Sequence, residues 1–247
     1  MPDICSILMI TIDRYEITKN VLRHNLDASG YPNIELLVCD NGSSDKRIIE
    51  EVASYKPRYH RINSKNEGVS HAFNQLFLRS SGKYIVLMGN DIKMPGGWLE
   101  EAIDYADAVP NSGIIGFNWG HSGVPPIQHK FGYNAHYLKS TGDRVFGTWV
   151  MRREVIDQVG LFDEAFGNYG LEDSCMNERV NRAGFNSFYL PNMKSEHICN
   201  DVGQKTEYRM MKDKSMAQNQ VILGKSIEAY NAGGSIRKPL PAIKDSI

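Results

Sequence analysis

The stretch IELLVCDNGSSD, residues 34–45, carries the pattern that decides the fold. Its first half is an apolar run, which predicts a strand covered on both faces, as in a parallel sheet. Its second half is a polar turn in which Ser44 is placed to cap a helix over about residues 45–55. A strand that leads through a polar loop into a helix is the repeating unit of an α/β sheet.

The same unit occurs on both sides of this stretch. Upstream, ICSILMI (4–10) predicts a buried strand, and residues 15–28 predict a helix with one apolar face. Downstream, KYIVLM (83–88) predicts a strand between helices at 67–80 and 97–109. Alternating strands and helices predict an α/β fold with three α/β/α layers, right-handed connections and a mostly parallel central sheet.

The second half of the chain has a different pattern. Residues 118–144 are rich in Gly, Pro, His and aromatic residues and show neither a strand period nor a helix period. Loops of this length in compact chains are often functional, and an acceptor loop and a packing loop fit this one equally well. Its histidines His121, His129 and His136 lack a recognisable metal-binding spacing. The remaining expected elements are strands at 60–63, 145–151 and 185–190 and helices at 153–159, 171–183 and 205–230.

Composition restricts the partners of the chain. It has 28 Lys and Arg against 29 Asp and Glu, for a formal net charge of -1. Such a balance creates no overall field that would attract nucleic acid or an anionic membrane, so we expect no nucleic-acid partner. An anionic ligand therefore needs a local site.

The chain also shows no sign of export or membrane insertion. No apolar run approaches the roughly 18–20 residues of a membrane span, and the first residues do not resemble a secretion signal. We therefore expect a cytoplasmic protein without a transmembrane segment. We also expect reduced, mostly buried thiols, because no CxxC pair occurs among the four cysteines, Cys5, Cys39, Cys175 and Cys199.

Polar residues follow three of the predicted strands at the point where each strand ends. Thr11–Arg14 follows the first strand, Asp40–Asp45 follows the second, and Asn90-Asp91 follows the KYIVLM strand. In open α/β sheets, ligands bind beyond the carboxyl ends of the strands. We therefore expect these three clusters to form one site.

Three longer segments together resemble the family 2 glycosyltransferases, which have the GT-A fold. They are SILMITIDR with LLVCDNGSSD, then NEGVSHAFNQLFLRSSGKYIVLMGND, then GTWVMRREVIDQVGLFDEAFGNYGLEDSCMNERVNRAGF. They lie within residues 4–197 in the order that the family has. Each segment is weak evidence by itself, but a chance chain would need all of them at matching spacing. The resemblance implies an enzyme that transfers a sugar from a nucleoside-diphosphate sugar to an acceptor hydroxyl.

The resemblance also implies which residues bind the donor. Asp40 would accept hydrogen bonds from the base, and uridine is the base that the family uses most often. Gly68 would let backbone approach the ligand closely. The residues alone leave alternatives, because Asp40-Asn41-Gly42 is also a common turn signal and Asn74 is also an ordinary helix residue. The donor-site candidates are Thr11, Asp13, Asp40, Asn66, Gly68, Asn74 and Asn90.

Gly89-Asn90-Asp91 resembles the family's metal motif. A diphosphate leaving group needs a cation such as Mg²⁺ or Mn²⁺ to neutralise its developing charge. The family often has Asp-x-Asp here, so Asn90 stands where an acid is usual and Asp91 is the acid that remains. His197 resembles the family's C-terminal histidine ligand, and imidazole suits Mn²⁺ better than Mg²⁺. A lone histidine is often structural, and the neighbouring Glu196 is a weaker candidate.

The Glu172-Asp173 pair resembles the family's catalytic acids. The resemblance assigns to Asp173 the role of accepting the proton of the acceptor hydroxyl as it attacks the anomeric carbon, which inverts the configuration there. The alternative is that both acids merely stabilise the start of a helix through its dipole. Trp149 and Tyr169 offer flat apolar surfaces that suit either a sugar ring or ordinary packing.

No internal repeat or clear domain boundary divides the chain, so we expect one GT-A-like domain over residues 1–230. Residues 1–117 would bind the nucleotide sugar, 118–200 would hold the acceptor and catalytic residues, and 201–230 would form a C-terminal helical segment. Residues 231–247 are expected to be a flexible tail.

Two other functions compete with this one. A sugar nucleotidyltransferase would carry a Gly-rich phosphate loop after the first strand, which Thr11–Arg14 is not. A non-catalytic nucleotide-sugar-binding protein would keep the fold without turnover, and Asn90 is compatible with that. The sequence leaves the oligomeric state open, and it leaves a glycan, a lipid-linked sugar and a protein as acceptors.

Overall fold

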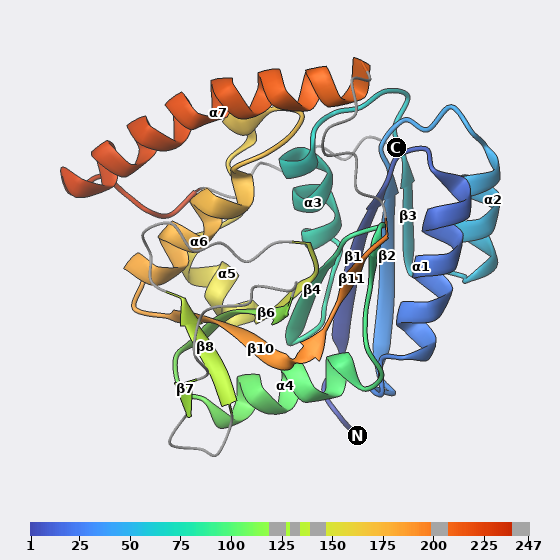
Figure 1. Ribbon diagram of the computed structural model, residues 1–247, viewed down its shortest axis with the longest axis horizontal. Helices are drawn as coiled ribbons and strands as arrows, with labels where there is room; N and C mark the ends of the chain where they lie inside the picture. The colour runs from blue at the N-terminus through green and yellow to red at the C-terminus, as the bar shows by residue number, and fades with distance from the viewer. Residues whose placement is uncertain (119–126, 129–133, 139–146, 199–206, 239–247) are drawn as a thin grey trace.

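The computed structural model describes residues 1–118, 127–128, 134–138, 147–198 and 207–238. Within these residues a nine-stranded sheet has the order β3-β2-β1-β4-β9-β6-β10-β8-β7 (Figure 1). Its strands are β1 (Cys5–Thr11), β2 (Ile34–Asp40), β3 (Tyr59–Ile62), β4 (Tyr84–Met88), β6 (Ser112–Asn118), β7 (Ile127–Gln128), β8 (Asn134–Leu138), β9 (Trp149–Arg152) and β10 (Asn186–Lys194).

Helices connect and cover the strands. They are α1 (Tyr15–Asp27), α2 (Arg47–Ser54), α3 (Val69–Phe77), α4 (Trp98–Ala108), α5 (Arg153–Val159), α6 (Glu172–Arg182) and α7 (Glu207–Asn231), with a short 3-10 helix η1 (Glu164–Phe166). A separate two-stranded sheet joins β5 (Ile92–Lys93) to β11 (Glu196–His197). None of the helices in the described ranges combines the length and the apolar character that crossing a membrane requires.

The central sheet is mostly parallel, as predicted. Strand β1 pairs in parallel with β2 and with β4, and β6 pairs in parallel with β10. Strand β9 lies antiparallel between β4 and β6, and β8 lies antiparallel to β10. The predicted α/β class and layered architecture are confirmed.

The unbroken apolar pattern of β1 follows from burial on both faces of the sheet. Ile7 and Met9 belong to a core formed with α1, α2 and α4, whereas Leu8 belongs to a core formed with α3, α5 and α6. Successive side chains of a strand point to opposite faces, so a strand covered on both sides needs apolar residues at every position.

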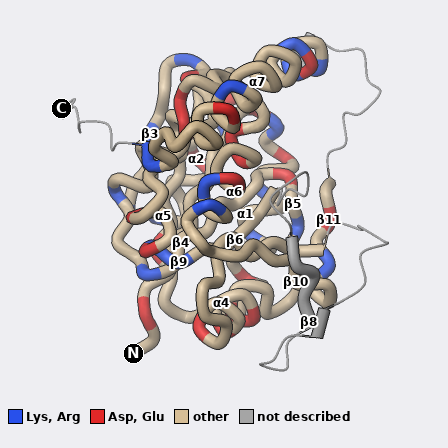
Figure 2. The backbone as a smooth tube through the Cα atoms, turned by 90° about the vertical axis from the view of Figure 1, so that its left-hand side faces the viewer, with Lys and Arg blue, Asp and Glu red and all other residues tan. Residues whose placement is uncertain are grey.

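Helix α7 lies outside these two cores, at the upper end of the molecule in Figure 1. A third apolar cluster joins it to the segment around α6 through Phe166, Leu171, Cys175 and Leu223. Figure 2, turned by a quarter, shows basic and acidic positions interspersed along the backbone, in keeping with the net charge of -1. Cys5, Cys39 and Cys175 are buried free thiols as expected, and Cys199 lies outside the described residues.

One region differs from the expectation. Strands β7 and β8 lie where the sequence showed no strand period, because β8 is defined by pairing with β10 rather than by an alternating pattern of its own. His136 is a residue of β8, while His121 and His129 lie outside the described residues. Within the segment expected to form a tail, the backbone N–H of Lys238 donates to Val159 O at 3.1 Å.

Candidate active site

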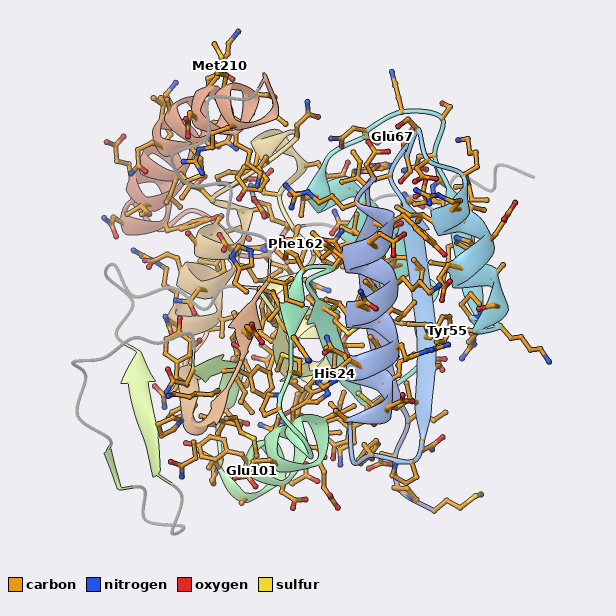
Figure 3. All side chains as sticks on the ribbon, turned by 45° about the vertical axis from the view of Figure 1, so that its right-hand side comes forward. His24, Tyr55, Glu67, Glu101, Phe162 and Met210 are labelled. Carbon is orange, nitrogen blue, oxygen red and sulfur yellow. The ribbon has the colours of Figure 1, made fainter. Side chains whose placement is uncertain are left out.

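The polar clusters lie at one edge of the sheet, as predicted. Strands β1 and β2 end side by side at Thr11 and Asp40, which are register partners, and Thr11 Oγ1 donates to Asp40 Oδ2 at 2.9 Å. Figure 3 shows Glu67, from the loop after β3, at this end of the molecule and Glu101 of α4 at the opposite end.

Asp40 is fully buried and holds the loop that follows β2. Besides the bond from Thr11, its carboxylate accepts hydrogen bonds from Ser43 N at 2.9 Å and Ser43 Oγ at 2.5 Å. Both Thr11 and Asp40 are 0% exposed. Direct contact with a base, which the resemblance implied, needs an exposure that Asp40 does not have in this arrangement.

Asp13 lies in the loop after β1, next to the loop after β2, and its side chain is partly exposed. Its Oδ1 accepts from Ser44 N and Ser44 Oγ, both at 2.8 Å, and from Asp45 N at 3.3 Å. Desolvation raises the pKa of Asp13, but these hydrogen bonds outweigh it and hold that pKa below its usual value. Asp13 is therefore the partly exposed carboxylate at the position where a nucleoside was expected.

Asn66 and Gly68 belong to a network centred on Asn41, a residue that sequence reasoning had treated only as part of a turn. Asn41 Nδ2 donates to Asn66 Oδ1 at 2.9 Å, and Asn41 Oδ1 accepts from Glu67 N at 3.0 Å. Asn66 Oδ1 also accepts from Gly68 N at 2.9 Å. The network ties the loop after β2 to the start of α3.

Gly68 is close to another part of the chain rather than to an open space. Its φ is 93°, and a Cβ there would lie 2.4 Å from the carbonyl oxygen of Gly167. The close backbone approach that we expected for a ligand is thus made by the loop that precedes α6. This contact joins the donor-side loops to the segment that carries Asp173.

The side chain of Asn74 is engaged with the segment that leads into η1. Its Nδ2 donates to Phe162 O at 3.1 Å and to Glu164 Oε1 at 2.8 Å, and its Oδ1 accepts from Phe162 N at 3.0 Å. Asn74 is 1% exposed, and Figure 3 shows Phe162 in the interior. The amide therefore fastens α3 to the segment before η1, in agreement with the structural alternative.

The two expected metal ligands come together through the small sheet. His197 pairs with Ile92 across β11 and β5, and Ile198 N donates to Asp91 O at 2.9 Å. As a result His197 Nε2 lies 3.2 Å from Asp91 Oδ2. Both side chains are partly exposed, at 31% for His197 and 19% for Asp91.

Arg14 is the residue at this site that sequence reasoning missed. Its Nη1 donates to Asp91 Oδ2 at 3.4 Å, on the same oxygen that faces His197. Arg14 has a φ of 59° and immediately precedes α1. A basic residue three positions after a strand-end threonine was the available signal, but the left-handed turn that directs it toward Asp91 was not predictable from the pattern.

Asp91 and His197 together fit a divalent cation whose coordination is completed by ligands from outside the chain. A carboxylate oxygen and an imidazole nitrogen face each other, and the guanidinium on that same oxygen shows that the position suits positive charge. In the described part of the chain, no group of three or more His, Cys, Asp and Glu could hold a metal ion. Phosphate oxygens and water would have to complete the coordination.

The amide of Asn90 lies beside helix α1. Asn90 Nδ2 donates to Thr18 Oγ1 at 3.3 Å, and the preceding Gly89 N donates to Thr148 Oγ1 at 3.2 Å. These bonds attach the end of β4 to α1 on one side and to the start of β9 on the other. The bend that presents Asp91 is therefore held by uncharged partners.

Asp173 stands in the first turn of α6. Its Oδ1 accepts from Ser174 N at 2.7 Å and Ser174 Oγ at 3.2 Å. Beside it, desolvation by burial raises the pKa of Glu172, and the negative charge of Asp173 raises it further. Neutralising Glu172 in this way reduces the repulsion between the two neighbouring carboxyls.

Helix α7 holds the loop that leads to Asp173. Asn219 Nδ2 donates to the carbonyl oxygens of Phe166, Tyr169 and Gly170 at 2.7, 2.9 and 2.7 Å. Lys212 Nζ lies 4.7 Å from the centre of the Tyr169 ring. Trp149, the other aromatic candidate, is 3% exposed in the core, with its ring centre 6.1 Å from that of Phe162.

Comparison with known proteins identifies the family. The sequence profile described as "Glycosyl transferase family 2" matches residues 6–160, which is more than half of the chain. The chain belongs to this family. Among curated proteins, this member of glycosyl transferase family 2 is 23% identical over 213 residues to the uncharacterized protein y4gI of Sinorhizobium fredii. That match covers 75% of the chain and 23% of y4gI, so the chain spans less than a quarter of the length of this relative.

Several solved structures share the fold of this member of the family. Mannosyltransferase PcManGT from Pyrobaculum calidifontis, in complex with GDP-Man and Mn²⁺, has a TM-score of 0.65 at 16% identity, over 82% of this chain and 59% of that one. GalNAc-T7 with UDP, GalNAc and Mn²⁺ has a TM-score of 0.60 at 12% identity, over 80% and 44%. S. aureus TarS 1-349 in complex with UDP-GlcNAc has a TM-score of 0.58 at 16% identity, over 78% and 60%.

Proposed function

We propose that this chain transfers a sugar from a nucleoside-diphosphate sugar to an acceptor hydroxyl with inversion at the anomeric carbon. The observation that carries the proposal is the 3.2 Å approach of Asp91 Oδ2 and His197 Nε2 at the carboxyl edge of the sheet. Ligands of α/β sheets bind at this edge, and the family membership supports the reaction class. The nucleotide sugars and Mn²⁺ in the related structures support the same donor chemistry.

The nucleoside is proposed to lie over the loops that follow β1 and β2. Asp13 presents a partly exposed carboxylate there, which could accept hydrogen bonds from ribose hydroxyls or a base N–H. Asp40 and Thr11 shape this surface from beneath, since both are fully buried. Uridine is the proposed base, although the related structures include one with GDP-Man and others with UDP.

Asp91 and His197 are proposed to hold Mn²⁺, with Mg²⁺ as the alternative. When bound, the ion would neutralise charge that develops on the departing diphosphate. The chain supplies one carboxylate here because Asn90 is uncharged and bonds Thr18. A site with few acidic ligands depends on phosphate oxygens, so metal and nucleotide should bind together.

Asp173 is proposed to act as the base. Its carboxylate accepts the proton of the acceptor hydroxyl while that oxygen forms a bond to the anomeric carbon. The bond from the anomeric carbon to the diphosphate oxygen breaks on the opposite face, and the diphosphate leaves with the bonding electrons. The loop held by Asn219 sets the position of Asp173, since the three carbonyls that Asn219 binds lie just before α6.

Calorimetric titration with UDP, GDP, CDP and dTDP, each with and without Mn²⁺, tests this proposal. We expect tight binding of one diphosphate that requires the metal. Failure of all four diphosphates to bind in the presence of Mn²⁺ would reject donor binding and with it the transfer reaction. Binding of a donor without turnover to any acceptor or to water would identify the non-catalytic alternative.

A further inference from the structure

One oxygen atom of the candidate site faces two basic groups. Asp91 Oδ2 lies 3.4 Å from Arg14 Nη1 and 3.2 Å from His197 Nε2. The side chain of Arg14 is 25% exposed, so the ion pair with Asp91 is partly shielded from water. A divalent cation that binds between Asp91 and His197 has to approach the oxygen that the guanidinium already contacts.

The backbone directs Arg14 to this position. Asp13 and Arg14 both have a left-handed backbone, with φ of 48° and 59°, which side-chain-bearing residues rarely adopt in succession. Ser43 Oγ accepts from Asp13 N at 2.8 Å, and Ser44 donates to the Asp13 carboxylate. The loop proposed to bind the nucleoside therefore also fixes the residue that faces the metal position.

We propose that Arg14 is the charge partner of Asp91 in the free protein, and that it exchanges Asp91 for the donor diphosphate when a divalent cation binds. This inference rests on the proposed function. Two cations compete for one carboxylate because Asn90 adds no second negative charge. A guanidinium released from Asp91 has a planar fork of N–H donors, which suits the oxygens of a diphosphate.

The exchange predicts that the metal ion and the diphosphate bind cooperatively. A metal ion alone has to displace the guanidinium from Asp91, which costs the ion pair between them, so Mn²⁺ alone binds weakly. A diphosphate supplies the anion that Arg14 loses, so metal and diphosphate each strengthen the binding of the other. Such coupling is reciprocal and can be measured from either ligand.

The test compares wild type with Arg14→Gln, and Arg47→Gln is the control. Arg47 lies in the neighbouring helix α2 and pairs with Asp45 at 2.6 Å, so its loss removes the same charge without a contact to Asp91. Free Mn²⁺ is followed by electron paramagnetic resonance, first without nucleotide and then with UDP or GDP. Thermal unfolding checks that each variant is folded, and Arg14→Lys, which keeps the charge, serves as a second variant.

For Arg14→Gln we expect Mn²⁺ alone to bind about fivefold more tightly, the size expected when a partly exposed ion pair is removed. We also expect the gain in Mn²⁺ affinity on adding diphosphate to shrink, while Arg14→Lys and Arg47→Gln stay near wild type. Equal Mn²⁺ affinity in wild type and Arg14→Gln, including no binding in either, would overturn the inference. If wild type binds Mn²⁺ but no diphosphate, the proposed function fails, and the Mn²⁺ titration still decides whether Arg14 competes for Asp91.

Discussion

His197 reaches Asp91 through backbone pairing between two distant segments. Strand β11 lies antiparallel to β5, His197 is the register partner of Ile92, and Ile198 N donates to Asp91 O at 2.9 Å. The 3.2 Å separation of His197 Nε2 and Asp91 Oδ2 therefore depends on main-chain hydrogen bonds. A site built in this way keeps its geometry when one of the two side chains is replaced, so single substitutions there report on ligand binding.

We expect Asp91→Ala to lose metal-dependent binding of the donor diphosphate. The substitution removes the carboxylate proposed as a metal ligand, and changes in the ligand environment of a metal typically lower its affinity about 10–100-fold or more. Calorimetric titration with the preferred diphosphate and Mn²⁺ measures the loss. Asp157→Ala on α5 is the matched control, because Asp157 is an exposed acid and is not one of the proposed site residues. Equal affinity in wild type and Asp91→Ala would reject the metal assignment.

We expect Asp173→Asn to bind the donor as wild type does and to lose transfer. The amide keeps the shape of the side chain and can still accept from Ser174 N, but it cannot take up the acceptor's proton. General bases typically contribute about 10²–10⁴-fold to the rate, so kcat should fall by such a factor. Titration with the diphosphate and a product assay separate the two effects. Full activity of Asp173→Asn would exclude Asp173 as the base.

The neighbouring Glu172 makes a prediction about stability and pH. Desolvation and the charge of Asp173 raise the pKa of Glu172 from its ordinary value of 4.5, so the folded chain binds more protons than the unfolded chain above that pH. By linkage, this group lowers the free energy of unfolding as pH rises above 4.5. Glu172→Gln removes the titration and should unfold at a higher temperature than wild type at neutral pH, with the difference vanishing near pH 4. A pH-independent difference would contradict the raised pKa.

The strand and helix pattern could be predicted from the sequence because it follows local burial. ICSILMI is apolar at every position since both faces of β1 are covered, and the polar clusters mark the ends of β1, β2 and β4. The strands that form only through pairing with a distant strand could not be predicted in this way. Strand β8 is set by β10, and β11 is set by β5.

The candidate site shows the same division. The resemblance named Asp91 and His197, and the structure brings these two side chains together. It also named Asn74 as a donor-site residue, but the amide of Asn74 is hydrogen-bonded to Phe162 and Glu164. Arg14 was missed because its direction depends on two consecutive left-handed residues, which no sequence period encodes. A motif can identify a residue type at a position, but the hydrogen bonds of the folded chain decide where its side chain points.

Asn219 connects α7 to the loop before the proposed base, so Asn219→Ala should affect both stability and transfer. The substitution leaves the carbonyls of Phe166, Tyr169 and Gly170 without this donor, and unpaired buried polar groups cost about 1–3 kcal/mol. Chemical denaturation and a transfer assay with the preferred donor measure the two effects. Gln220→Ala, which replaces an exposed amide at the next position of the same helix, should change stability by no more than about 0.5 kcal/mol and leave transfer unchanged. Wild-type stability and kcat in Asn219→Ala would show that α7 does not position this loop.

Gly68→Ala should disturb the contact between the donor-side loops and the segment that carries Asp173. A Cβ at Gly68 would lie 2.4 Å from the Gly167 carbonyl oxygen, and its φ of 93° is also unfavourable for alanine. The loop before α6 must therefore move, and we expect a loss of about 1–3 kcal/mol in stability together with reduced transfer. Gly97→Ala is the control for backbone strain, since Gly97 has a φ of 70° and a Cβ there meets nothing within 4 Å. Because both variants carry a positive φ and only Gly68→Ala carries the clash, a drop in transfer confined to Gly68→Ala would show that the contact with Gly167 positions the base. Equal transfer by the two variants would show instead that transfer does not depend on the close contact between Gly68 and Gly167.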